Sequence, residues 1–428
     1  MPAAVVAALI GVPAASAAPA GGLATHAAMH SGVGPMALFG VDESLPENPD
    51  LLRHMMWSRS GKVPAATAGD LRVATFSAGL TRSAPGVLAD ELSAPGSVQA
   101  QRVAETVQRA APDVVLLTDF DVDSGEAAAQ SFRTNYLAVG TGGQEGIDYP
   151  HVYTAEVNNG VDTGADLDND GVIGGPGDSF GPGEFAGQHG MVLFSRHPLD
   201  EDGIRTFRDL RWDTVPGNAI PEGKYTELER SVLRLSSTAH WDIPVTVGDR
   251  TVHVLAAQPE DPGAGTTPVE RHHDEMRFWA DYIVGDAGYL KDDDGRSGGL
   301  PAGSDFVLVG DFGPRADRVL DGDHPSAIAS LLESEAIQDP APESAGALAA
   351  DPDAATATRA ARDGDSLELL RSDYVLPSAS LTATAAGVFW PANGQLGSHL
   401  TRITDSAEDG EDHRVTERRL VWTDLGMD

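Results

Sequence analysis

The pattern of apolar and polar positions predicts regular structure along most of the chain from residue 70 onward. Residues 71–76 (LRVATF) alternate between the two types and are β-branched enough for a strand. Apolar residues at helical spacing predict an amphipathic helix over residues 98–111, and the apolar run at 113–120 predicts a buried strand. These elements, in this order, indicate a β–α–β unit at the start of the folded region.

Segments of the same kinds continue to the end of the chain. Helices are expected at 270–284 and 325–334, and the Ala-, Asp- and Glu-rich residues 338–370 are expected to be a loop or a disordered insertion. Because strands of both patterns interleave with few helices, we expect an α+β sandwich of two packed mixed sheets flanked by helices. Six more strands are expected, at residues 190–195, 231–237, 252–257, 305–311, 373–378 and 418–425.

The N-terminal region differs in pattern from the rest of the chain. A short apolar run ends in small residues, and residues 15–17 (ASA) match the A-x-A cleavage pattern, so residues 1–18 are interpreted as a signal peptide. A disordered Ala-rich tail is the alternative. Residues 19–66, rich in Ala, Gly and Pro, are expected to be a flexible lead-in to one folded domain at 67–428. No later stretch approaches the ~20 apolar residues of a membrane span, so we expect a secreted protein.

Composition narrows the possible partners. The 428 residues include no cysteine, which excludes disulfides and thiolate metal sites. The formal net charge is −36, and a surface this acidic repels nucleic acid, whose binding depends on Lys and Arg replacing counterions. We therefore expect a monomer that binds a small phosphoester or another small ligand, and no large nucleic-acid interface.

Several predicted strands end in polar residues, at the strand tips where open sheets gather their sites. Read in chain order from Leu71 to Leu425, the sequence resembles the endonuclease/exonuclease/phosphatase superfamily, in particular its secreted bacterial phosphodiesterase-like branch. The resemblance implies metal-dependent phosphoester hydrolysis, in which Mg²⁺ or Mn²⁺ polarises the phosphoryl oxygen while water attacks in line. The matching stretches are LRVATFSAGL, PDVVLLTDFD, DLDNDGVIGGPGDSFGPGEFAGQHGMVLFSRHP, VLRLSSTAHWDIPV, HHDEMRFWADYI, FVLVGDF, RSDYVLPS and RRLVWTDL.

The resemblance implies two metal ligands, and both are replaced in this chain. Ser77 stands where the family has an Asn, and Asp119 stands where it has a Glu. Asp119 remains a hard-oxygen ligand and Ser77 offers a hydroxyl, so weakened Mg²⁺ or Mn²⁺ binding is one interpretation. The other is that Asp119 is a solvated carboxylate at a strand end. Asp373, in RSDYVLPS, matches the family.

The phosphate-contacting and base positions that the resemblance implies are also replaced. Gln258 stands where the family has a His, and Asp311 is retained while Gly313 replaces an Asn. Glu417 and Arg418 replace the terminal Asp-His pair. An arginine, with a pKa above ~12, cannot act as a general base. We therefore expect a pseudoenzyme, inactive or severely impaired; the alternative is an active phosphodiesterase or phosphatase with a remodelled metal site.

An Asp-His pair just upstream of the last strand offers an alternative base. It consists of Asp412 and His413. A five-residue shift along a strand turns every side chain to the opposite face, so only a rearranged loop would present His413 to the site.

An acidic segment follows the spacing of a calcium-binding loop. Asp166, Asp168 and Asp170 occupy its first, third and fifth positions, with Gly171 at the sixth, but the Glu of the twelfth position is missing. A structural calcium site and a plain surface turn both remain open.

Histidines elsewhere are assigned structural roles. His189, before a predicted strand, is interpreted as a packing residue, and His272, at a predicted helix start, as a capping or solvent-facing residue. Arg196 and Arg234, near strand ends, would contact a phosphate or pair with carboxylates.

Overall fold

The computed structural model describes residues 62–260, 268–285, 287–313, 327–363, 366–402 and 417–427. The expected signal peptide, most of the expected lead-in and His413 lie outside these residues. Val63, which falls inside the expected lead-in, is 6% exposed and packs in the core, so the packed region extends upstream of residue 67. A search of these described ranges finds no helix with the length and apolar character of a membrane span.

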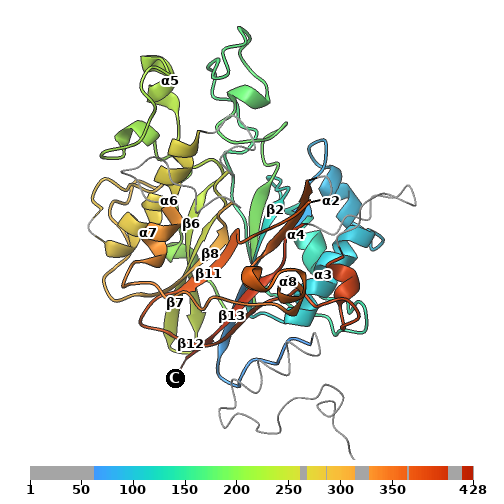
Figure 1. Ribbon diagram of the computed structural model, residues 1–428. Helices are drawn as coiled ribbons and strands as arrows, with labels where there is room; N and C mark the ends of the chain where they lie inside the picture. The colour runs from blue at the N-terminus through green and yellow to red at the C-terminus, as the bar shows by residue number, and fades with distance from the viewer. Residues whose placement is uncertain are drawn as a thin grey trace, which may run out of the picture. The chain divides into compact units, whose positions relative to one another are not determined.

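Two mixed sheets form the centre of the fold (Figure 1). The first has the strand order β12-β13-β1-β2-β4-β3, and only β1 and β2 run parallel. Its strands are β1 (Leu71–Leu80), β2 (Val114–Phe120), β3 (His151–Tyr153), β4 (Gly190–Ser195), β12 (Thr382–Val388) and β13 (Val421–Gly426).

The second sheet has the order β11-β8-β7-β6-β5, and only β7 and β8 run parallel. One apolar cluster, which includes Val73 of the first sheet and Val254 of the second, joins the two inner faces. This arrangement confirms the predicted α+β sandwich. The strands of the second sheet are β5 (Arg205–Thr206), β6 (His240–Val247), β7 (Arg250–Ala257), β8 (Asp305–Asp311) and β11 (Asp373–Pro377).

Helices cover the outer faces of both sheets (Figure 1). On the first sheet, the buried stripe of α3 (Val98–Ala110) packs with α2 (Val87–Leu92) and α4 (Ala127–Phe132). On the second, α6 (Val269–Val284) packs with α7 (Ala327–Leu332). The expected helix at 270–284 therefore forms with nearly its expected bounds.

Two expectations about local structure are wrong. Residues 231–237 are not a strand, because Thr226 and Glu229 form a capping box that starts a helix, α5 (Glu227–Val232). Residues 338–370 are not only a loop, since they contain α8 (Ala345–Ala350), which Ser344 caps, and a hairpin of two further strands. These strands are β9 (Arg359–Asp363) and β10 (Ser366–Leu370).

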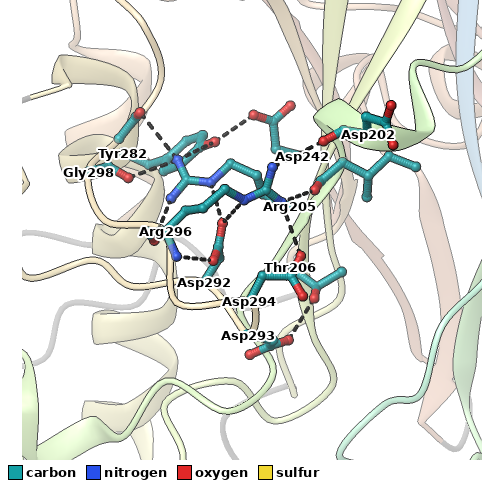
Figure 2. Close-up of polar contacts among 12 residues, drawn as sticks. Asp202, Arg205, Thr206, Asp242, Tyr282, Asp292, Asp293, Asp294, Arg296 and Gly298 are labelled. Carbon is teal, nitrogen blue, oxygen red and sulfur yellow. Dashed lines mark hydrogen bonds and ion pairs between the residues drawn. The ribbon is translucent and has the colours of Figure 1, made fainter.

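A polar network fixes the edge of the second sheet (Figure 2). Arg205 of β5 donates to Asp292 at 2.8 Å and to the carbonyl of Gly298 at 2.9 Å. The Tyr282 hydroxyl donates to Asp242 at 2.5 Å. Because the Arg205 and Asp292 side chains are only 12% and 1% exposed, this pair holds the two-residue strand against the loop at 291–298. None of these residues lines the pockets described below.

Candidate functional site

The ends of several strands meet in one cavity of about 1300 Å³, which we call the strand-end pocket. The parallel pairs β1–β2 and β7–β8 each place two carboxyl ends together, and β13 enters antiparallel beside β1. Strand ends of the two packed sheets thus lie next to one another. Seven residues singled out from the sequence line this pocket: Ser77, Asp119, Gln258, Asp311, Gly313, Glu417 and Arg418.

Arg418 forms a two-pronged ion pair with Asp311 at the floor of the pocket. Its Nη1 and Nη2 lie 2.9 Å from Oδ1 and Oδ2 of the carboxylate. Nη1 also donates to the Ser372 hydroxyl and lies 3.6 Å from Asp373. Glu417, the residue before Arg418, pairs with Arg359 at 3.3 Å.

The two aspartates around Arg418 are deeply buried, and burial raises the pKa of both. The pKa of Asp311 is raised by burial against the opposing charge of Arg418. The pKa of Asp373 rises to about 7, because of burial and the nearby charge of Asp311. Asp373 is fully buried and does not line the pocket, so its contribution runs through Arg418, Ser372 and Thr358. This cluster can hold one cation tightly, and Arg418 already supplies it.

A His-Asp pair lies on the pocket wall. His189 Nδ1 lies 2.5 Å from Asp119 Oδ1, and both side chains are about one-third exposed, at 36% and 30%. Asp119 lies at an irregularity in the pairing of β2 with β4. Its backbone φ is +55°, and the φ of His189 is +53°, so both residues adopt the left-handed conformation. Non-glycine residues in this left-handed region carry strain of about 1–3 kcal/mol each, which elsewhere clusters at functional sites. The interpretation of His189 as a packing residue is therefore wrong.

Neighbouring groups orient this pair and tune its charge. Gln258 Oε1 accepts the backbone N–H of Asp119 at 3.0 Å, and Asp121 accepts that of His189 at 3.2 Å. Burial by itself lowers the pKa of His189, but the hydrogen bond with Asp119 and the charges of Asp119 and Asp121 raise it above its ordinary value. The sequence signal was a histidine directly before a strand, and only the strand pairing brings it to Asp119.

The residues of the pocket do not fit the divalent metal that the family implies. Asp119 shares its Oδ1 with His189, and Asp311 is bound by the guanidinium of Arg418. Ser77, the other position at which the family has a metal ligand, lines the pocket and offers only a hydroxyl. The carboxylates of Asp119 and Asp311 are thus already engaged by protein side chains.

The acidic loop, residues 166–178, gathers a different set of carboxylates from the one expected. Ligand atoms of Asp166, Asp168 and Asp178 lie within 4.8 Å of one another. Asp170 is not part of this set; its backbone N–H donates to both Asp166 and Asp168 at 3.1 Å. The buried Asp178 takes its place because the chain doubles back, with the backbone N–H groups of Leu167 and Gly174 donating to its carboxylate.

Three other candidates lie outside the strand-end pocket. His272 is buried, its Nε2 lies 2.8 Å from the carbonyl of Phe312, and burial lowers its pKa to about 4, so its assignment as a capping or solvent-facing residue is wrong. Arg196 pairs with Asp113 at 3.1 Å, and Arg234 donates to Asn158 at 2.6 Å.

A two-sheet sandwich with a polar pocket at its strand ends defines the class of protein, a phosphoesterase-type fold. The chain belongs to the Endonuclease/Exonuclease/phosphatase family, whose model matches residues 91–413. None of the curated protein sequences compared with it matches.

Solved structures similar to this chain are distant in sequence. An endonuclease/exonuclease/phosphatase from Beutenbergia cavernae is 19% identical with a TM-score of 0.46, covering 83% of this chain and 71% of its own. A family protein from Bacteroides thetaiotaomicron is 11% identical with a TM-score of 0.41, covering 85% and 98%. D. rerio TDP2 complexed with a single-strand DNA product is 10% identical with a TM-score of 0.40, covering 83% and 98%.

Proposed function

We propose that this chain keeps the ligand-binding scaffold of a phosphoester hydrolase but has lost metal-dependent hydrolysis. The observation that carries the proposal is the Arg418–Asp311 ion pair in the strand-end pocket. A permanent cation there cannot accept a proton from water, and it also occupies the carboxylate that is the retained family position. Loss of a positioned general base alone costs roughly 10²–10⁴ in rate.

A small ligand fits the electrostatics of the pocket better than a polyanion does. Each arginine that lines it is paired with a carboxylate: Arg82 with Glu91 at 2.6 Å, Arg359 with Glu417 at 3.3 Å and Arg418 as described. Such pairs leave little uncompensated positive charge for consecutive phosphates, and the net charge of −36 repels them at long range. A compact phosphoester, held at one point, is the ligand class that we propose.

The His189–Asp119 pair supports a second candidate, an active hydrolase that uses a different base. A histidine whose Nδ1 is held by a carboxylate presents Nε2 as a proton acceptor, as general bases in hydrolases do. Because the pKa of His189 is raised, such a base would be increasingly protonated as the pH falls through that pKa. Its activity would therefore rise with pH through the neutral range.

One assay separates the two candidates. Hydrolysis of bis(p-nitrophenyl) phosphate is measured with Mg²⁺, Mn²⁺ or Ca²⁺ for the parent, Asp311→Ala, His189→Ala and His413→Ala, with Lys291→Ala as a control outside the pocket. We expect no metal-dependent turnover above the uncatalysed rate. Turnover that Asp311→Ala abolishes would sink the pseudoenzyme proposal. Turnover lost about 100-fold in His189→Ala, and rising with pH, would establish the second candidate, and loss only in His413→Ala would assign the base to that residue.

We also propose that the chain is exported. The support is the apolar run and the A-x-A pattern at residues 15–17. Expression with the native N-terminus in a secreting host should give extracellular protein that has lost residues 1–18, as N-terminal sequencing would show. Protein retained in the cell with an uncleaved N-terminus would contradict export.

A further inference from the structure

A second, smaller pocket of about 480 Å³ opens beside the strand-end pocket, and the two share Pro182 and Glu260. We call it the Arg271 pocket. The acidic loop, the segment around α5 and the start of α6 form its walls. The loop before β4 and α5 extend from the same end of the sandwich (Figure 1).

Arg271 lines this pocket as a buried cation. Its residue surface is only 4% exposed, and two of its nitrogens donate to carbonyls, Nε to Leu235 at 3.0 Å and Nη2 to Ser236 at 2.9 Å. Among the described residues, no carboxylate lies within ion-pair distance of the guanidinium, and Nη1 has no protein acceptor. A buried charge is costly unless it is paired, and the two fixed carbonyls hold the guanidinium rigidly at the pocket wall.

Two further donors line the same pocket. Lys224, one of the three lysines in the sequence, places its Nζ 5.4 Å from the centre of the Tyr225 ring. Tyr225 also lines the pocket, and burial raises the pKa of its phenol while the charge of Arg271 opposes that rise. Pro268, the residue before α6, also lines the pocket, so the positive end of a 16-residue helix faces it.

Three carboxylates lie in or near the same pocket. Asp168 lies in the acidic loop and Glu260 on the side shared with the strand-end pocket. Glu275, one turn along α6 from Arg271, is fully buried, and burial raises its pKa to about 7, so it is partly protonated near neutrality. Among the described residues, the arginines of the strand-end pocket pair with carboxylates, whereas Arg271 donates to backbone carbonyls.

We propose that the Arg271 pocket binds a compact oxyanion, a phosphate or carboxylate group, held by Arg271, Lys224 and the hydroxyl of Tyr225. Guanidinium and ammonium groups make short charge-assisted hydrogen bonds to such oxygens. The site does not depend on whether the strand-end pocket hydrolyses its ligand.

Calorimetric titration of the full chain with inorganic phosphate, and separately with acetate, tests the site in the presence of a chelator. We expect phosphate binding that weakens about 5-fold in Lys224→Ala and roughly 10-fold or more in Arg271→Gln. Lys291→Ala removes the same charge elsewhere and should change nothing. His189→Ala, in the strand-end pocket, tests whether the same anion binds there instead.

Several outcomes would overturn this assignment. They are the absence of phosphate and acetate binding by the parent, equal affinity in Lys224→Ala and Lys291→Ala, or a loss seen only in His189→Ala, which would place the anion in the strand-end pocket. If Arg271→Gln does not fold, the double variant Lys224→Ala/Tyr225→Phe serves instead, and unchanged affinity in it would equally refute the site. Tighter phosphate than acetate binding identifies a phosphoryl group as the ligand, and the reverse identifies a carboxylate.

Discussion

Arg418 shows how one side chain changes both the chemistry and the stability of a site. A titratable histidine at this position would exchange protons near neutral pH, whereas an arginine remains a cation. In this protein, that cation compensates two buried carboxylates, Asp311 and Asp373. We propose that this arginine leaves the position without a titratable base, and it stabilises two acids that would otherwise repel each other.

Removing this cation should destabilise the fold. Arg418→Gln leaves Asp311 and Asp373 buried without a counter-charge, and breaking a buried ion pair in this way costs about 3–5 kcal/mol. Arg359→Gln breaks a more exposed pair with Glu417 and should cost less than about 1 kcal/mol. Urea unfolding at pH 8 measures both free energies. Equal, small losses in the two variants would show that Arg418 does not compensate the aspartates.

Glu275 gives stability a pH dependence of known sign. Burial raises its pKa to about 7 in the folded state, against about 4.3 in an unfolded chain. The folded state thus holds a proton that the unfolded state releases, so the stability contributed by Glu275 falls as the pH rises from about 4.3 to 7. Glu275→Gln should remove this fall and gain stability relative to the parent between pH 4.5 and 8.

Chemical unfolding of parent and variant across this pH range measures that difference. Asp373, whose pKa is also about 7, remains in both proteins, so only the difference between them reports on Glu275. Glu270→Gln, on the first turn of the same helix, is the matched control. A parent and a Glu275→Gln variant with parallel pH profiles would contradict the assignment.

At the scale of elements, helix capping and a proline explain where the pattern of apolar residues predicted the wrong element or missed a strand. The Thr226–Glu229 capping box starts α5, whose last two residues, 231–232, take the place of the first two of the strand expected at 231–237. β6 was missed because Pro244 lies inside it, and proline is confined to places where its missing N–H is tolerated. Its neighbour β5 is only two residues long, so much of β6 is close to a sheet edge.

The acidic loop should respond to calcium as one element. Asp166, Asp168 and Asp178 gather their oxygens at one point, and an ion that binds only the folded state raises the unfolding midpoint in proportion to its occupancy. Calcium should therefore raise the melting temperature of the parent relative to chelator. Asp168→Asn should lose most of that increase, whereas Asp170→Asn should keep it because Asp170 lies outside the cluster. Identical midpoints with calcium and chelator would favour a plain turn.

At the scale of the whole molecule, the scaffold and the chemistry are separable. The strand ends still converge on one pocket, while most family residues at those ends are replaced. Gly313, with a φ of +80°, sits in the left-handed region, where Asn is among the best tolerated non-glycine residues. The backbone therefore accepts the residue that the family has at this position.

Restoring the family residues should create activity. The minimal set is Gln258→His, Gly313→Asn, Glu417→Asp and Arg418→His, extended by Ser77→Asn and Asp119→Glu for the metal. The mechanism that the family resemblance implies needs a divalent ion, so hydrolysis should appear only when Mg²⁺ or Mn²⁺ is added, and it should exceed the parent by roughly 10² or more. Arg418→His alone should not raise hydrolysis measurably, because catalytic residues that act as a unit give little activity when the others are missing.

The readout is metal-dependent hydrolysis of an activated phosphodiester, with circular dichroism to confirm that each variant is folded. If the variant with the full set of substitutions folds but hydrolyses nothing with either metal, then the backbone geometry of the pocket, and not only its side chains, differs from that of a hydrolase.

Much of this protein follows from local pattern. Apolar residues at period-2 and helical spacing predict most strands, α3, α6 and the two-sheet sandwich. They do so because the spacing of apolar residues along a short segment decides which face of that segment is buried. The resemblance of the strand-end residues to the family likewise implies a pocket with an arginine in place of the base. The contacts between distant residues needed the tertiary structure: His189 meets Asp119 70 positions away through an irregular strand pairing, and Arg418 meets Asp311 107 positions away. Asp178 displaces Asp170, and Arg271 lines a pocket as a buried cation, for the same reason: register, chain reversal and burial decide which charges meet, and none of these is local in sequence.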